Sequence, residues 1–224
     1  LEYTPDQIVV STGAKQSLAN VCLSLLDPED EVLLPCPYWV SYAEIIKLAE
    51  GVPVEIKSTI DSDFKITPSQ LEASITSRTK MIMFSSPCNP SGTVYTQSEL
   101  EAIAKMLDKY PNIYIVSDEI YEHINFTDKH YSIGTIPSMK DRTVTVNGVS
   151  KGFAMTGWRV GFIGAPLWIA KACNKIQGQV TSATCAIAQK ATERAMLAEP
   201  RSTTKEMKET FLKRRNMLVS LLKD

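Results

Sequence analysis

The sequence predicts an α/β fold with a mostly parallel, open sheet and helices on both of its faces. Several short segments are apolar on successive residues, which is typical of strands covered on both sides, and the clearest is 81–84. Segments with apolar residues at helical spacing lie between these strands. Strands that alternate with helices need crossover connections, and such connections leave neighbouring strands parallel.

The first half of the chain is expected to hold three strands and two helices. Residues 14–26 carry apolar side chains at helical spacing, and Asp27-Pro28 stops the run. A second helix is predicted over 39–49 and is ended by Gly51. The strands beside these helices are the apolar segments 8–10, 32–34 and 52–56.

The second half continues the alternation after the strand at 81–84. The spacing of Leu100, Ile103, Ala104 and Leu107 predicts a helix. The further predicted strands are 113–116, 143–146 and 160–163.

Residues 1–200 are expected to form one large, incomplete domain, and 201–224 a long helix that leads into an absent small domain. The 224 residues, 44% of them hydrophobic, are enough for one substantial core. A helix over 203–222 would be roughly 30 Å long and would need a surface to cover. We therefore expect a fragment cut at both ends. The apolar face of this helix is formed by Met207, Phe211, Leu218 and Leu222.

The composition excludes several classes of partner. With 24 basic and 25 acidic residues the net charge is −1, so no nucleic-acid partner is expected. No apolar run approaches the roughly 20 residues that cross a bilayer, and the first residues do not resemble a signal peptide. We expect a cytoplasmic protein without a membrane partner. The five cysteines lack Cys-x-x-Cys spacing, which predicts reduced, mostly buried thiols and no metal site.

Ligands of an open parallel sheet bind beyond the carboxyl ends of its strands, and Thr12-Gly13-Ala14-Lys15 is expected there. This segment joins a predicted strand to the first helix. Free amides at a helix start favour a phosphate, and a glycine permits close approach. An ordinary glycine turn capped by Thr12 is the alternative.

Asn89 and Trp39 also follow predicted strands. Asn89 lies between prolines in the segment 86–92, which would fix the direction of its amide, and one X-Pro bond there could be cis. A plain surface turn is the alternative. Trp39 could stack on a cofactor ring, or simply belong to the core.

Asp118 ends the strand at 113–116 and is expected at the same rim. Beside a pyridine nitrogen, a carboxylate would keep that nitrogen protonated, and a protonated ring can accept electrons from a substrate. Tyr121 could return to the site and hydrogen-bond a ring oxygen. A helix-capping aspartate and a packed tyrosine are the alternatives.

Lys151 follows the strand that begins at 143, in a segment of small residues. We expect its amine in a confined pocket, where the neutral form could attack an aldehyde. Arg159 supplies a planar fork suited to a phosphate. A solvated lysine and a surface salt bridge are the alternatives. With Asp118, these are the parts needed to hold and activate pyridoxal 5′-phosphate.

The order and setting of these motifs resemble the large domain of class I aminotransferases, the fold-type I pyridoxal phosphate enzymes. The bacterial aspartate/prephenate aminotransferase branch is the most similar, and the resemblance covers essentially the whole chain. Its most specific elements are Ser150-Lys151 with Gly157-Trp158-Arg159, Ser117-Asp118-Glu119-Ile120-Tyr121 and Asn89-Pro90-Ser91-Gly92.

The resemblance implies a role for each residue around the cofactor ring. Lys151 would bond to the cofactor aldehyde and later move the proton of the substrate α-carbon. Asp118 would pair with the ring nitrogen. Tyr121 and Asn89 would bond the ring oxygen, and Trp39 would stack on the ring.

The resemblance also implies the residues that bind the phosphate and the substrate. The phosphate would be held by Gly13, Ala14, Lys15, Ser150 and Arg159. The substrate would contact Trp39, Asn89 and Lys15, the last through a distal carboxylate.

The implied function is an aminotransferase that moves an amino group between aspartate and a 2-oxo acid such as 2-oxoglutarate, by a ping-pong mechanism, as a homodimer. Members of the family continue beyond both ends of the matching segment and carry the arginine for the substrate α-carboxylate in a small domain. Gly148 also stands where some relatives have a phosphate-binding serine. Two alternatives stay open: a pyridoxal phosphate-dependent lyase on the same scaffold, and a non-catalytic sensing domain.

Overall fold

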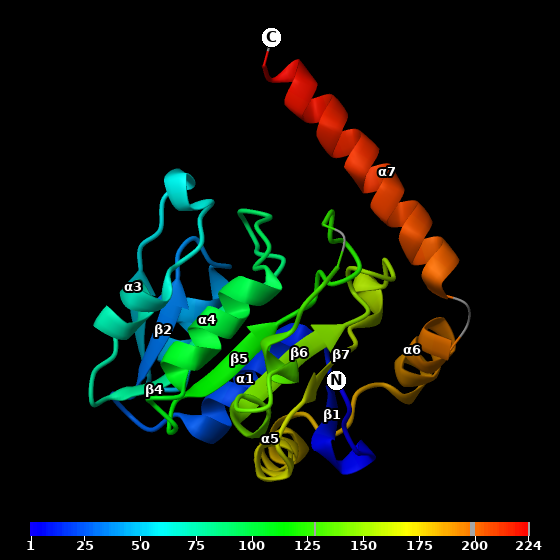
Figure 1. Ribbon diagram of the computed structural model, residues 1–224. Coiled ribbons are helices and arrows are strands. Elements are labelled where there is room, and N and C mark those ends of the chain that lie inside the picture. Colours follow the sequence, from blue (N-terminus) through cyan, green and yellow to red (C-terminus); the bar gives the residue numbers. More distant parts are fainter. Residues whose placement is uncertain (128, 198–199, 224) are drawn as a thin grey trace.

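The computed structural model describes residues 1–127, 129–197 and 200–223 and confirms the α/β class (Figure 1). In this part of the chain, seven strands form one sheet in the order β1-β7-β6-β5-β4-β2-β3. The strands are β1 (Ile8–Ser11), β2 (Glu31–Pro35), β3 (Val52–Ile56), β4 (Thr79–Ser85), β5 (Tyr114–Asp118), β6 (Thr143–Gly148) and β7 (Gly161–Gly164). The α-helices are α1 (Ala14–Leu25), α2 (Ser41–Leu48), α3 (Pro68–Ala73), α4 (Gln97–Leu107), α5 (Leu167–Val180), α6 (Ala186–Leu197) and α7 (Pro200–Leu221). Short 3-10 helices are η1 (Pro5–Gln7), η2 (Ile60–Ser62), η3 (Ile133–Thr135), η4 (Lys140–Arg142) and η5 (Thr156–Trp158).

Helices cover both faces of the sheet, as predicted. On one face, α1, α2 and α5 bury Leu18, Ile46 and Ile169 against the strands. On the other face, α3 and α4 bury Leu71 and Leu107. The strands between them are apolar on successive residues because each of their faces packs against a helix layer.

Strand β7 departs from the parallel arrangement. The strands β6, β5, β4, β2 and β3 run parallel, whereas β7 pairs antiparallel with both β6 and β1. The connection from β6 to β7 contains η5 but no α-helix, and the Val149 amide donates to the Val160 carbonyl at 3.3 Å. A strand parallel to β6 would need a crossover connection that leads the chain back to the edge where β6 begins. The connection from β6 to β7 makes no such crossover, and β7 is therefore antiparallel. Both ends of this connection therefore lie at the edge where β6 ends.

The long C-terminal helix is confirmed as α7, which extends away from the sheet in Figure 1. Its predicted apolar face is largely open: Phe211, Leu218 and Leu222 are 40%, 55% and 78% exposed. The division of the chain near residue 200 stays a prediction. None of the described helices is both long and apolar enough to cross a bilayer.

The prediction of mostly buried thiols is correct for two of the cysteines. All five cysteines are free, but only Cys22 and Cys173 are buried, between α1 and α5. Cys36 and Cys88 are half-buried and Cys185 is exposed, because they lie in connecting segments outside the two apolar layers.

Candidate functional site

A cavity of about 180 Å³ opens at the carboxyl edge of the sheet. The strands β1, β2, β4, β5 and β6 end there, and the ends of these strands and the segments that follow them contribute the side chains that line the cavity. Nine of the ten predicted site residues line the cavity: Ala14, Lys15, Trp39, Asn89, Asp118, Tyr121, Ser150, Lys151 and Arg159. Four lining residues are absent from the sequence-based set: Tyr42, Ser85, Ile120 and Thr156.

Asp118 is a buried acid at the end of β5, with only 4% of its surface exposed. Its Oδ2 accepts a hydrogen bond from the Tyr42 hydroxyl at 2.7 Å, and its Oδ1 accepts one from the Ile120 amide at 3.2 Å. Burial raises the pKa of Asp118 to about 6, although both hydrogen bonds act in the opposite direction. The carboxyl group is thus fixed in direction and costly to ionise until an opposite charge lies beside it.

Tyr42 is a site residue that the sequence interpretation misses. It is 1% exposed on α2, and burial, together with the nearby Asp118, raises its pKa well above 10. The signal that could have found it is its spacing, because residues three apart on a helical turn share a face. Tyr42 lies three positions after Trp39, and the two rings meet edge to face, with centroids 5.7 Å apart.

Trp39 lies half-buried just before α2 and lines the cavity. The Lys15 ammonium lies 4.8 Å from the centroid of its ring, which is within cation–π range. Trp39 and Lys15 therefore form one wall of the cavity together, although Lys15 lies on α1 and Trp39 in the segment before α2.

Lys151 lines the cavity but is more open to solvent than expected. The side chain is exposed, and its Nζ lies 5.8 Å from the centroid of the Tyr121 ring. The prediction of a confined amine is wrong for this chain, because the β6–β7 connection that carries Lys151 forms the rim of the cavity. The preceding Ser150 is buried, and its carbonyl accepts a hydrogen bond from the Thr156 hydroxyl at 2.8 Å.

Gly13 does not line the cavity but supports one end of it. It is the N-cap of α1 with φ 86°, and a Cβ at this position would lie 2.3 Å from a guanidinium nitrogen of Arg159. Only glycine accommodates both this backbone conformation and this contact. Arg159 is oriented by a hydrogen bond from its Nη1 to the Thr156 carbonyl at 2.9 Å. The start of α1 and the Arg159 guanidinium thus lie against each other.

Asn89 lines the cavity from the loop that follows β4. Both Ser86-Pro87 and Asn89-Pro90 are cis, as was predicted for one of the X-Pro bonds in this loop. The backbone amide of Asn89 donates to the Ser85 hydroxyl at 3.3 Å, and the backbone amide of Tyr95 donates to the Ser86 hydroxyl at 3.1 Å.

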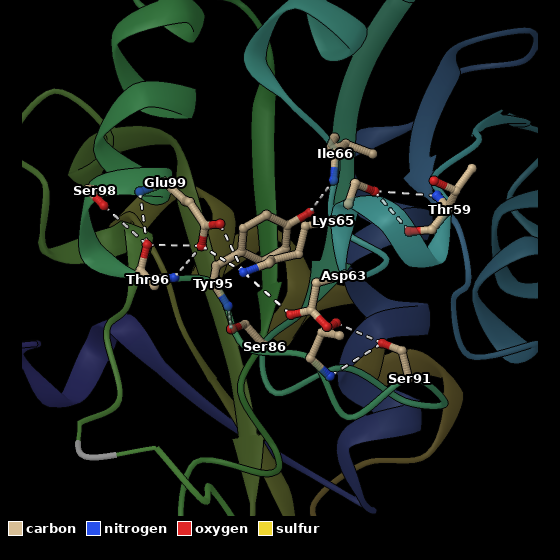
Figure 2. Close-up of polar contacts among 12 residues, drawn as sticks. Thr59, Asp63, Lys65, Ile66, Ser86, Ser91, Tyr95, Thr96, Ser98 and Glu99 are labelled. Atoms are coloured by element: carbon tan, nitrogen blue, oxygen red, sulfur yellow. Dashed lines mark hydrogen bonds and ion pairs between the residues drawn. The ribbon is translucent and has the colours of Figure 1, made fainter.

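A polar cluster joins this loop to the segment before α3, as Figure 2 shows. The Ile66 amide donates to the Tyr95 hydroxyl at 3.1 Å. Lys65 lies 2.9 Å from Glu99 and 3.6 Å from Asp63, and only 16% of the lysine side chain is exposed. The Tyr95 end of the loop that carries Asn89 is therefore tied to the segment before α3.

Outside the cavity, Glu119, Glu122 and His130 form the only described group whose ligand atoms lie close enough together, within 4.8 Å, to hold a metal ion. Glu119 already accepts hydrogen bonds from Ser117 at 2.9 Å and Ser132 at 2.5 Å, and it pairs with His130 at 2.8 Å. These partners satisfy the buried carboxylate without a cation.

Comparison with known proteins identifies the family. The family described as "Aminotransferase class I and II" matches residues 1–224. The aspartate/prephenate aminotransferase of Cereibacter sphaeroides is 45% identical over 226 residues, covering 100% of this chain and 56% of that protein. A bifunctional aspartate aminotransferase and glutamate/aspartate-prephenate aminotransferase of Petunia hybrida is 49% identical over 88% of this chain and 41% of its own length.

Solved structures agree with this result. The aspartate aminotransferase of Rhizobium meliloti has a TM-score of 0.94 and 41% identity, covering 98% of this chain and 55% of that one. The Thermus thermophilus aspartate aminotransferase with maleate has a TM-score of 0.94 and 39% identity, covering 98% and 57%. The chain spans about half the length of the relatives it matches. By sequence and by fold, it belongs to the class I and II aminotransferase family.

Proposed function

We propose that the whole protein is a pyridoxal 5′-phosphate-dependent aminotransferase and that this chain supplies most of its cofactor site. One observation carries the proposal: the exposed amine of Lys151, the buried acid Asp118 and the Arg159 guanidinium line a single cavity. A site for this cofactor needs an amine for an aldehyde, an acid for a pyridine nitrogen and a cationic group for a phosphate. The names of the relatives support the aminotransferase activity.

The residues present fit the two ends of this cofactor. Asp118 is buried with two hydrogen-bond donors fixing its oxygens, which suits a carboxylate that must meet a cationic ring nitrogen. At the other end, the first amides of α1 have no partner within the helix, and Gly13 leaves room beside Arg159 where a Cβ would collide. Ser150 lines the same cavity and adds a hydroxyl to it.

When bound, pyridoxal phosphate supplies an electron-withdrawing ring that accepts the electron pair left on the substrate α-carbon. Lys151 would take the proton from that carbon as a general base and would then deliver it to the cofactor C4′ as a general acid. Asp118, oriented by Tyr42, would stabilise the positive charge on the ring nitrogen. Tyr121 and Asn89 would donate hydrogen bonds to the ring oxygen.

The remaining residues would hold the phosphate and one ring face. Ala14 and Lys15 would offer backbone amides, Gly13 would leave room for the phosphate, and Ser150 and Arg159 would offer side-chain donors. Trp39 would cover the ring, a position consistent with its place in the cavity wall.

We further propose that aspartate and a 2-oxo acid such as 2-oxoglutarate are the substrates. The relatives named for aspartate support this choice, as does the Thermus thermophilus structure named with maleate. Lys15 would meet the distal carboxylate of an acidic substrate from its place beside Trp39. Asn89 would contact the substrate from the opposite loop.

The test is chemical labelling followed by an activity assay on the whole protein. After incubation with pyridoxal phosphate and reduction with borohydride, peptide mapping should find the label on Lys151, and Lys151→Ala should remove it. Label on another lysine would refute the site. Keto acid formation that depends on an amino acceptor would support transamination, whereas release of ammonia and pyruvate would indicate a lyase instead.

A further inference from the structure

Gln177 on α5 is a buried polar residue that the proposed site does not use. Only 4% of its surface is exposed. A buried amide is costly unless its polar groups are hydrogen-bonded, so its partners indicate its role. Its Nε2 donates to the Val10 carbonyl at 2.8 Å, and its Oε1 accepts from the Ser11 hydroxyl at 2.7 Å and from Asn20 Nδ2 at 2.9 Å.

These three partners flank the turn at the start of α1. Val10 and Ser11 end β1, and the Ser11 carbonyl accepts a hydrogen bond from the Gly13 amide at 2.8 Å. Asn20 lies on α1 and is 4% exposed. One side chain therefore ties the strand that enters the turn to the helix that leaves it.

A second link joins the same turn to the end of α5 from the solvent side. Gln16 Oε1 accepts from the Thr12 amide at 2.6 Å, and Gln16 Nε2 donates to the Thr181 hydroxyl at 2.5 Å. Thr181 is the C-cap of α5. The last turn of α5 thus holds the Gly13 turn both from the interior and from the surface.

We infer that Gln177 is a positioning residue for the phosphate-binding amides of the Gly13 turn, an inference that rests on the proposed function. Gln177 does not line the cavity, and its influence reaches the ligand through the backbone of residues 10–13. The amides of that turn meet only the phosphate end of the ligand. Loss of the Gln177 hydrogen bonds should therefore weaken phosphate recognition and leave recognition of the ring intact.

The experiment compares pyridoxal phosphate with pyridoxal, which lacks the phosphate, as ligands of the whole protein. In Gln177→Met, the dissociation constant for pyridoxal phosphate should rise about tenfold, as expected when buried hydrogen bonds are lost. The dissociation constant for pyridoxal should change by less than about twofold. Gln189→Met is the matched control, because Gln189 is a part-buried glutamine on α6 that donates to the Thr184 carbonyl at 2.7 Å. It should change neither constant.

An equal loss of affinity for both ligands, or no loss beyond that of Gln189→Met, would overturn the inference. Wild-type protein that binds pyridoxal as tightly as pyridoxal phosphate would instead contradict the proposed phosphate site itself. If Gln177→Met does not fold, Ser11→Ala removes one of the hydrogen bonds and should give a smaller loss with the same preference for the phosphorylated ligand.

Discussion

Asp118 couples the proposed chemistry to the stability of the fold. An ordinary aspartate has a pKa of 3.8, whereas burial raises the pKa of Asp118 to about 6. The folded protein therefore holds this proton over a range in which the unfolded chain has released it. The resulting stabilisation is fully present below pH 3.8 and is lost as the pH rises through 6. The difference amounts to at most about 3 kcal/mol.

Asp118→Asn should remove this pH dependence. Without cofactor, the free energy of unfolding of wild type should fall relative to that of the variant as the pH rises from 4 to 7, by roughly 1–3 kcal/mol. Urea denaturation at both pH values measures the change, and the exposed Asp61→Asn is the control. Parallel pH curves for wild type and Asp118→Asn would contradict the prediction.

Gly161, the first residue of β7, packs against the start of α1. A Cβ at Gly161 would lie 2.2 Å from the backbone nitrogen of Ala14, which cannot move without displacing the start of α1. Gly161→Ala should therefore destabilise the protein by about 1–3 kcal/mol and weaken binding of pyridoxal phosphate. Thermal unfolding and a binding titration check both effects.

Gly178→Ala provides the matched control for that substitution. Gly178 lies on α5, and a Cβ there would meet no atom within 4 Å. Since alanine favours a helix over glycine, this variant should gain up to about 1 kcal/mol and keep its affinity for the ligand. If both variants behaved alike, the contact of Gly161 with Ala14 would have no special importance.

The residues that sequence motifs predict and those they miss differ in kind. The place of Asp118 and Lys151 in the cavity lining was predictable because each stands at or just after the end of an apolar strand, and that of Arg159 because it lies eight residues after Lys151 in the same segment. Tyr42 hydrogen-bonds Asp118, and Gln177 hydrogen-bonds Val10 and Ser11, yet the sequence pattern of both is that of ordinary helix residues. Only packing reveals what such residues contact.

At the scale of elements, the loop that carries Asn89 depends on its tie to the segment before α3 (Figure 2). Tyr95 is 5% exposed, and its hydroxyl accepts the Ile66 amide hydrogen bond at 3.1 Å. Tyr95→Phe leaves that buried amide without this partner, which should cost about 1–3 kcal/mol. Chemical denaturation measures the loss.

Tyr110→Phe is the comparison for Tyr95→Phe. The Tyr110 hydroxyl makes only a long hydrogen bond, 3.4 Å, to Glu72. Its removal should change stability by less than about 0.5 kcal/mol. Equal effects of the two substitutions would show that the Tyr95–Ile66 bond does not hold the loop.

Most of the elements, but not all of their directions, follow from the sequence pattern. Periodicity predicts strand 81–84, which lies within β4, and strand 113–116, of which all but the first residue lies in β5, because a short, unbroken apolar run is typical of a strand buried on both faces. It says nothing about strand direction, so the antiparallel β7 could not be predicted. Helix α6 was missed because only Ala188 and Thr192 are buried on it, which leaves little apolar periodicity.

At the scale of the whole molecule, two large apolar side chains near the cavity are exposed. Val40 and Trp158 flank the site residues Trp39 and Arg159 and are 73% and 47% exposed. Large exposed apolar groups beside a site often mark an interface. We predict that light scattering of the whole protein will give twice the monomer mass. A Val40→Glu variant should shift that mass toward the monomer, and a monomeric wild type would contradict the prediction.

The hairpin from β6 to β7 limits how this chain can vary in length. Its two ends are fixed by the Val149–Val160 hydrogen bond, and both Lys151 and Arg159 lie between them. An insertion between these ends would alter the spacing between amine and guanidinium, while a similar insertion among the exposed residues near Ile60 would be absorbed at the surface. The hairpin thus fixes the distance between the two groups. Homologous chains that bind the same ligand should keep the number of residues in the hairpin even where the residue types differ.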